Sequence, residues 1–235
     1  PGDKSISHRY AMLGAIAITV CSGVPTATAV GYINWPTILV LFAFFVLSAQ
    51  LRLSGFFEKV AGGISARLDN PARFLLTLMV VTAALSAFLN HDIVCYAFTP
   101  VVATALVRRR INPVPFLVAL AIASNIGAAA TLVGNPQNLT IGQAAQLNFG
   151  AYFAWCITPV VFALGCAYAL IWLISRRSLA LAGPEPKFRQ EAAPHPFNRG
   201  HAVKGLIILG LVVLFFFSPV PKEVTALIAA GIHLA

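Results

Sequence analysis

The sequence predicts an all-α, polytopic membrane protein, and three observations support this fold class. Of its 235 residues, 59% are hydrophobic and only 10% are charged, whereas soluble domains carry about 25% charged residues. The mean hydropathy is +0.84. Several apolar runs approach the length that a helix needs to cross a hydrocarbon core of about 30 Å. We expect membrane segments at 11–31, 36–51, 72–89, 93–107, 114–133 continued by 139–147, 151–174, 205–218 and 223–235.

The basic residues follow from this topology. The formal net charge of +9 would suit a nucleic acid or an anionic surface. If residues 72–107 enter and leave the membrane on one side, fifteen of the sixteen Lys and Arg residues lie on that side, and only Lys222 does not. Such a bias is typical of cytoplasmic loops. We therefore expect membrane lipid around the chain and no nucleic-acid partner.

Residues 72–107 predict a re-entrant helical hairpin rather than two full spans. Arg73 and Arg108–Arg110 flank the stretch on one side, and the polar segment Asn90–Asp92 interrupts its middle. The two arms of 18 and 15 residues would be roughly 27 and 22 Å long as helices, which is short for a full crossing.

Two segments between the expected membrane spans are not expected to cross the membrane. Residues 54–70 show apolar side chains at helical spacing, which predicts an amphipathic helix at the membrane interface; these are Phe56, Phe57, Val60 and Ile64. Residues 175–204 are rich in Pro and in charge, which predicts a cytoplasmic loop.

Asp92 is the acidic residue that falls inside an expected membrane segment, since the other six lie outside or at segment ends. A carboxylate at that depth is costly and indicates a site for a cation or a proton. The alternative is a helix N-cap for the second arm. His91 could titrate near neutral pH, although a single His at a hairpin tip is more often structural.

A polar sequence breaks the apolar helix that begins at residue 114. Gly134 permits unusual backbone torsions, and Pro136 lacks an N–H, so a helix running through it would leave the Leu132 carbonyl without a partner. Non-helical backbone within a membrane is tolerated where it lines a cavity or is buried in protein. Broken helices of this kind bind ions and anionic substrates in many secondary transporters.

Small and polar residues on this helix predict either close helix packing or a polar cavity wall. Ser124, Gly127, Ala128 and Thr131 follow helical spacing, with Asn125 beside them. The polar series continues into Asn135 and Asn138, whose amide oxygens suit Na⁺, while a helix N-terminus favours anions. Four scattered cysteines predict buried free thiols without a metal; they are Cys21, Cys95, Cys156 and Cys166.

Two stretches, LSAFLNHDIVCYAFTPVV and ASNIGAAATLVGNPQNLTIG, resemble the ion-transporter superfamily that includes citrate, dicarboxylate and arsenite carriers. The likeness extends over about residues 33–220. It implies two inverted repeats, each with a re-entrant hairpin and an unwound helix. Family members usually have Asn directly before the Asp, or Ser-Asn-Thr, whereas His91 intervenes here.

The resemblance implies a division of the chain and a binding site. The first repeat would be 18–174, the loop 175–204 and the truncated second repeat 205–235. The residues implied to bind substrate or ion are Asn90, Asp92, Ser124, Asn125, Gly127, Thr131, Gly134, Asn135, Pro136 and Asn138. Of these, Na⁺ would be held at Asn90, Asp92, Asn135 and Asn138.

The first seventeen residues, PGDKSISHRYAMLGAIA, resemble the N-terminus of 3-phosphoshikimate 1-carboxyvinyltransferase, in which Lys4, Ser5 and Arg9 would contact anionic substrates. Nothing after Ile18 supports that soluble enzyme, so we expect a chimeric end that acts as a basic flank. The chain also lacks an initiator Met and stops in an apolar run, which predicts a piece of a longer protein.

The sequence therefore predicts a secondary active transporter of a small anion in a bacterial inner membrane, and not an enzyme. The mechanism would be symport with Na⁺ or H⁺ by alternating access, without another cofactor. The expected partners are the anion, the missing second repeat and a second copy of the chain. The alternatives are a Na⁺/H⁺ antiporter that uses Asp92, a fragment of the carboxyvinyltransferase and a non-transporting membrane scaffold.

Overall fold

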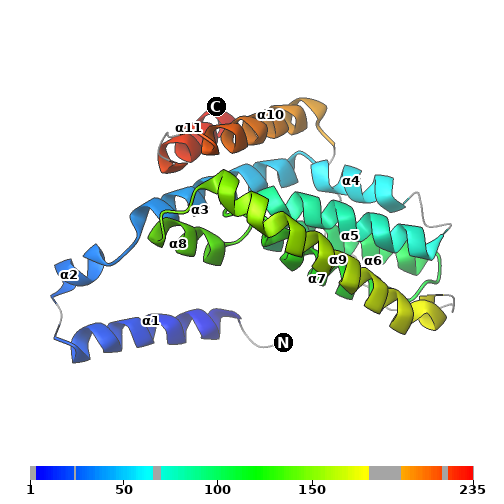
Figure 1. Ribbon diagram of the computed structural model, residues 1–235, viewed down its shortest axis with the longest axis horizontal. Helices are drawn as coiled ribbons and strands as arrows, with labels where there is room; N and C mark the ends of the chain where they lie inside the picture. Colours follow the sequence, from blue (N-terminus) through cyan, green and yellow to red (C-terminus); the bar gives the residue numbers. More distant parts are fainter. Residues whose placement is uncertain (1–3, 24, 66–69, 180–196, 219–221, 235) are drawn as a thin grey trace. The chain divides into compact units, whose positions relative to one another are not determined.

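A computed structural model describes residues 4–23, 25–65, 70–179, 197–218 and 222–234. Over these ranges the regular elements are helices (Figure 1). They are α1 Lys4–Cys21, α2 Thr26–Gly31, α3 Trp35–Leu53, α4 Phe56–Ser65, α5 Pro71–Phe88, α6 His91–Arg108, α7 Val114–Ala128, α8 Pro136–Ala144, α9 Phe149–Leu179, α10 Arg199–Phe216 and α11 Lys222–Leu234.

The fold class is confirmed as that of an all-α, polytopic membrane protein. Four described helices are long and apolar enough to cross a membrane: α3, α5, α9 over Phe149–Ser175, and α10. The chain forms two compact units, residues 1–35 and 36–235. Each unit is described by itself.

In the first unit, the expected continuous span 11–31 is wrong. Helix α1 ends at Cys21 and α2 begins only at Thr26. Gly23 adopts a φ of +64°, a left-handed conformation that commonly ends a helix. Pro25, two residues after Gly23, lacks the N–H that a continuing helix needs.

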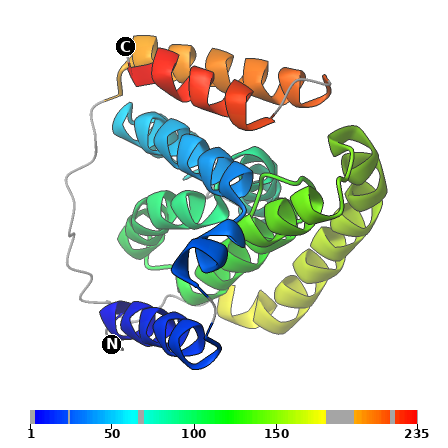
Figure 2. The same ribbon diagram turned by 90° about the vertical axis from the view of Figure 1, so that its left-hand side faces the viewer.

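In the second unit, α5, α7 and α9 pack side by side with α6 against α7 (Figures 1 and 2). Aromatic side chains fill the junctions between helices. The Phe74 ring on α5 lies 5.2 Å from the Phe116 ring on α7, measured between centroids. The Phe57 ring on α4 meets Phe98 on α6 edge to face at 6.1 Å. Such aromatic pairs add about 0.5–1.5 kcal/mol beyond their buried area.

Helix α4 confirms the predicted amphipathic helix but not its place at a lipid interface. Phe57 and Ala61 are fully buried, and Ile64 is 5% exposed. The apolar face packs against the protein core because α4 folds back onto α6 and α5. A face already covered by protein is not available for the bilayer surface.

The hairpin consists of α5 and α6, joined by only Leu89 and Asn90. His91 and Asp92 belong to α6, so the expected three-residue polar interruption is wrong. Both arms have 18 residues, about 27 Å each, because α6 begins two residues earlier and ends one residue later than expected. Re-entry from one membrane face stays a prediction.

A cysteine-labelling experiment tests whether both ends of the hairpin lie on one membrane face. Single cysteines at positions 70 and 110, in a protein otherwise free of cysteine, should react with a membrane-impermeant maleimide from the same face. The physical reason is that a two-residue connection makes both outer ends of the arms neighbours. Labelling of the two positions from opposite faces would show that an arm crosses the membrane.

The predicted loop 175–204 is shorter than expected at both ends. Helix α9 continues to Leu179, and α10 begins at Arg199; residues 180–196 lie outside the described residues. Where the chain returns, the Asn198 N–H donates to the Ser54 carbonyl at 2.9 Å. The Lys59 ammonium lies 5.7 Å from the Phe197 ring centroid. The entry to α10 is thus anchored on the corner between α3 and α4.

Candidate functional site

Two helix N-termini lie next to each other at the candidate site. Helix α6 is capped by Asn90, whose Oδ1 accepts from the Asp92 N–H at 2.9 Å. Helix α8 is capped by Asn135, whose Oδ1 accepts from the Asn138 N–H at 2.7 Å. Asp92 is therefore not the cap of the second arm, and that alternative is wrong. Asn caps a helix about as well as Asp does, so Asn90 can cap α6 without Asp92.

The helix break runs from Ala129 to Asn135, so it begins five residues earlier and ends three residues earlier than the expected break at 134–138. Helix α7 ends at Ala128 rather than at residue 133. Pro136 does not interrupt a helix but begins α8, where its missing N–H costs nothing. Thr131 consequently lies beyond α7, so the expected helical stripe ends at Ala128.

The Asn138 side chain holds the break together from inside. Its Nδ2 donates to the carbonyl of Ala128 at 3.2 Å and to that of Thr131 at 3.1 Å. The first bond satisfies a carbonyl that the end of α7 leaves without a helical partner, and the second holds a carbonyl within the break. An amide nitrogen has two N–H groups, and Asn138 uses both, so only its Oδ1 is left for a ligand. That oxygen can coordinate a cation but cannot donate a hydrogen bond to an anion.

The hairpin tip and the helix break are joined by two hydrogen bonds. The Thr131 hydroxyl donates to the carbonyl of Ala87, at the end of α5. His91 Nδ1 lies 3.3 Å from the Gly134 carbonyl oxygen, which can only accept, so Nδ1 carries the proton. The predicted residues from the hairpin and from the break therefore meet in one place.

Two glycines permit close backbone approaches around this site. A Cβ at Gly127 would lie 2.2 Å from the backbone oxygen of Ala83 on α5. A Cβ at Gly134 would lie 2.3 Å from the backbone oxygen of Ala128. Gly127 therefore serves close packing of α7 on α5, which is the structural interpretation of the small-residue stripe.

Ser124 and Asn125 diverge on α7. Ser124 is fully buried, and its hydroxyl donates to the Ala121 carbonyl at 3.0 Å. Cys95 Sγ lies 2.9 Å from the Ser124 oxygen, and since the single Ser124 proton is already used, the thiol donates. Asn125 is exposed, and its Nδ2 donates to the Ala121 carbonyl at 2.9 Å.

Asp92 presents its carboxylate on the surface of this chain. Its side chain is 63% exposed, whereas that of His91 is 16% exposed. His91 Nε2 lies 3.6 Å from Asp92 Oδ1, a distance that makes an ion pair when the imidazole is protonated. The exposed carboxylate beside two helix N-termini provides one negative and two partial positive charges within one small region.

Two contributors to the site were not predicted as site residues. Cys95 lies one turn after Asp92 on α6, and its sulfur contacts the Ser124 hydroxyl. The three-residue spacing between Asp92 and Cys95 was the sequence signal that could have placed Cys95 at the site. The Tyr152 hydroxyl on α9 donates to the Ala129 carbonyl at 3.4 Å. All four cysteines are free, but Cys21 and Cys166 are exposed, so the expectation of buried thiols is wrong for these two.

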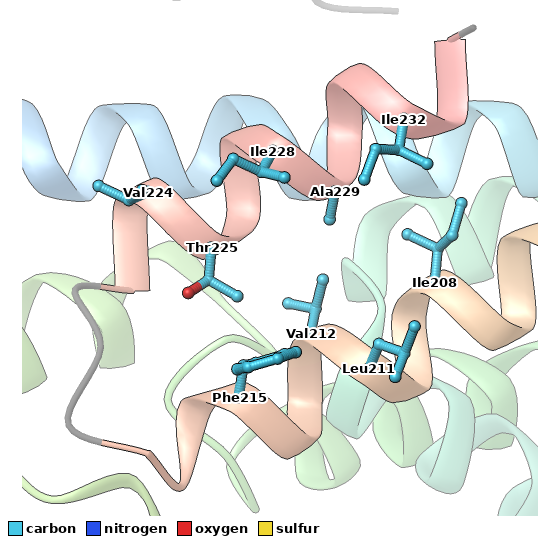
Figure 3. Close-up of a pocket in the computed structure, with 9 residues that line it drawn as sticks. All are labelled: Ile208, Leu211, Val212, Phe215, Val224, Thr225, Ile228, Ala229 and Ile232. Atoms are coloured by element: carbon cyan, nitrogen blue, oxygen red, sulfur yellow. The ribbon is translucent and has the colours of Figure 1, made fainter.

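An apolar groove between α10 and α11 lies apart from the predicted residues (Figure 3). Its volume is about 270 Å³. The side chains that line it are Ile208, Leu211, Val212, Phe215, Val224, Thr225, Ile228, Ala229 and Ile232. Thr225 supplies the polar atom of this lining, so the groove has no charged group with which to hold an ion.

The candidate site thus combines a helical hairpin, a broken helix and an exposed carboxylate where the two meet. Residues 8–235 match the citrate transporter family, and the chain belongs to that family. The match begins within the first seventeen residues, and α1 runs from Lys4 to Cys21 without a break at residue 17. The resemblance of residues 1–17 to the carboxyvinyltransferase, and the domain boundaries built on it, stay predictions.

Relatives of the chain are membrane proteins and transporters. An uncharacterized transporter of Mycobacterium tuberculosis is 30% identical over 97% of the chain and 56% of its own length. A 46 kDa membrane protein of Mycobacterium leprae is 35% identical over 66% of the chain and 38% of its own length. A silicon efflux transporter of rice, Oryza sativa, is 30% identical over 66% of the chain and 32% of its own length. The chain thus spans about half, or less, of these relatives.

Proposed function

We propose that the protein is a secondary active transporter that moves a small anion together with Na⁺ or H⁺ across a bacterial inner membrane. The observation that carries this proposal is the meeting of the α6 and α8 N-termini at the His91–Gly134 contact, beside the Asp92 carboxylate. Helix N-termini attract anions, and a carboxylate attracts a cation. Both partners of a symport reaction would therefore find a matching group.

The hydrogen-bond donors and acceptors support separate places for the two ions. Asp92 and the Oδ1 atom of Asn138 offer only acceptors, which suits a cation. The anion would then bind at the free N–H groups of the first turns of α6 and α8. Alternating access would expose this pair of ions first to one side of the membrane and then to the other.

The names of the family and of one relative support a proposal for the substrate class. The family is named for citrate, and the rice relative is named for silicon efflux. We propose a small carboxylate or oxyanion, because a site built on helix N-termini and amides recognises charge and size more than a carbon skeleton.

Gradient-driven uptake tests the proposed function. The product of the complete gene, reconstituted in proteoliposomes, should accumulate one of citrate, succinate, arsenite or silicate when an inward Na⁺ or H⁺ gradient is imposed. Dissipating the gradient with an ionophore should remove the accumulation. If none of these solutes accumulates under either gradient, the proposal is wrong.

A Na⁺/H⁺ antiporter is the second candidate, favoured by the exposed Asp92 carboxylate. In the same proteoliposomes, a trapped pH dye would report proton release driven by Na⁺ without any anion. Proton exchange that does not need an anion would favour the antiporter over the symporter.

The 235-residue chain by itself is expected not to transport. It spans 56% of the mycobacterial relative, and one hairpin with one broken helix would supply only half of a midplane site between two repeats. Uptake into proteoliposomes that hold only these residues should equal that of empty liposomes. Uptake at the rate of the complete protein would show that this chain, alone or as a pair, builds a whole site.

A further inference from the structure

We propose that Thr131 is a positioning residue that clamps the hairpin to the broken helix and does not itself bind the transported ions. This inference rests on the proposed transport function. It assigns to Thr131 a role different from the ligand role that its place among the polar residues suggested. The argument depends on how completely its hydroxyl group is used.

The Thr131 hydroxyl has no hydrogen-bonding capacity left for a ligand. A hydroxyl offers one donor and two acceptor positions. The donor is given to the Ala87 carbonyl. The two acceptor positions receive the Gly134 N–H at 3.1 Å and the Val133 N–H at 3.3 Å. The side chain is also 0% exposed, so neither an ion nor a substrate can reach it.

The partners of Thr131 show what it positions. Ala87 is in the last turn of α5, two residues before the tip connection, whereas Val133 and Gly134 lead into the cap of α8. One buried hydroxyl therefore fixes the end of the first arm against the start of α8. His91, the first residue of the second arm, makes another contact with the helix break on the other side of the tip. Together the two contacts set the spacing of the α6 and α8 N-termini.

The clamp makes a specific prediction about ligand affinities. Loss of a direct ligand weakens the binding of the one ion that it contacts. Loss of a positioning residue displaces both helix N-termini, so the apparent affinities for anion and cation should fall together, with a lower maximal rate. A conservative replacement that keeps the hydroxyl should keep both apparent affinities and the maximal rate near those of the wild type.

The experiment compares Thr131→Ser with the nearly isosteric Thr131→Val in the complete protein, by gradient-driven uptake of the anion identified for the wild type. We expect Thr131→Ser within about twofold of wild type, since serine keeps the three bonds. We expect Thr131→Val to lose roughly tenfold in maximal rate and about threefold to tenfold in both affinities. Weakening of only one ion's affinity, equal damage by serine, or wild-type behaviour of the valine variant would each overturn the proposal.

His91 keeps the test decisive if Thr131→Val does not fold. His91→Ala removes the second contact, whereas His91→Asn can place an amide N–H where Nδ1 lies. The alanine variant should weaken both affinities, and the asparagine variant should recover them. Failure of asparagine to recover them would overturn the clamp. Absence of uptake by the wild type itself would instead reject the transport function on which the clamp rests.

Discussion

Replacing Gly127 by alanine should remove most of the correctly folded protein. The added Cβ would lie 2.2 Å from the oxygen, 2.4 Å from the Cα and 2.6 Å from the carbonyl carbon of Ala83. These are backbone atoms of α5, so no side chain can rotate away. Overpacking typically costs about 1–3 kcal/mol and occasionally more, and we expect the upper end because two helices must separate.

Size-exclusion chromatography of a fluorescent fusion in detergent measures this effect, together with the thermal midpoint. Gly210→Ala is the matched control, because position 210 on α10 has no atom within 4 Å of the added Cβ. That control should equal or exceed the wild type, since alanine favours a helix by up to about 1 kcal/mol over glycine. Equal stability of the two alanine variants would show that α7 does not pack so closely on α5.

Replacing Asp92 by asparagine should give the largest functional loss in a protein that still folds. The carboxylate is 63% exposed, so its neutralisation leaves no buried group without a partner. A coupling cation would lose its formal counter-charge, and we expect about tenfold weaker apparent cation affinity or more. Because Asn90 and not Asp92 caps α6, asparagine at position 92 gains nothing as a cap.

Cation titrations of anion uptake measure this loss. Glu223→Gln is the matched control, since it neutralises a carboxylate on α11 and should leave the cation dependence unchanged. Asn138→Ala should weaken cation affinity less than Asp92→Asn. It should also lower stability by about 1–3 kcal/mol, since its two donors hold the Ala128 and Thr131 carbonyls. Unchanged cation dependence in both site variants would remove the coupling site.

The sequence was sufficient for the parts of the fold that depend on local chemistry. Apolar length predicted the membrane helices, and the Gly134–Asn138 segment predicted a break in the helix that begins at Val114. The amphipathic spacing of residues 56–64 predicted α4. Boundaries were less accurate because a strong cap outweighs the apolar pattern, as when the Asn90 cap starts α6 at His91 rather than at residue 93.

The roles of the site residues depended on contacts between distant segments. Thr131 and Ala87 are 44 residues apart, and so their bond leaves no trace in local spacing. The position of Gly127 against Ala83 separates a packing role from a binding role, which the small-residue pattern alone left open. The contact between Phe57 on α4 and Phe98 on α6 likewise could not be predicted from the spacing of residues along α4.

Ligand protection of Cys95 tests most directly whether the hairpin tip and the helix break form the binding site. Cys95 is partly buried, lies one turn from Asp92, and is hydrogen-bonded to Ser124. In the complete protein with this thiol as its single cysteine, we expect the anion and the coupling cation together to slow alkylation several-fold. Choline at equal ionic strength should have no effect, and Asp92→Asn should abolish the cation's contribution. An alkylation rate that is the same with and without both ions would contradict a site at this place.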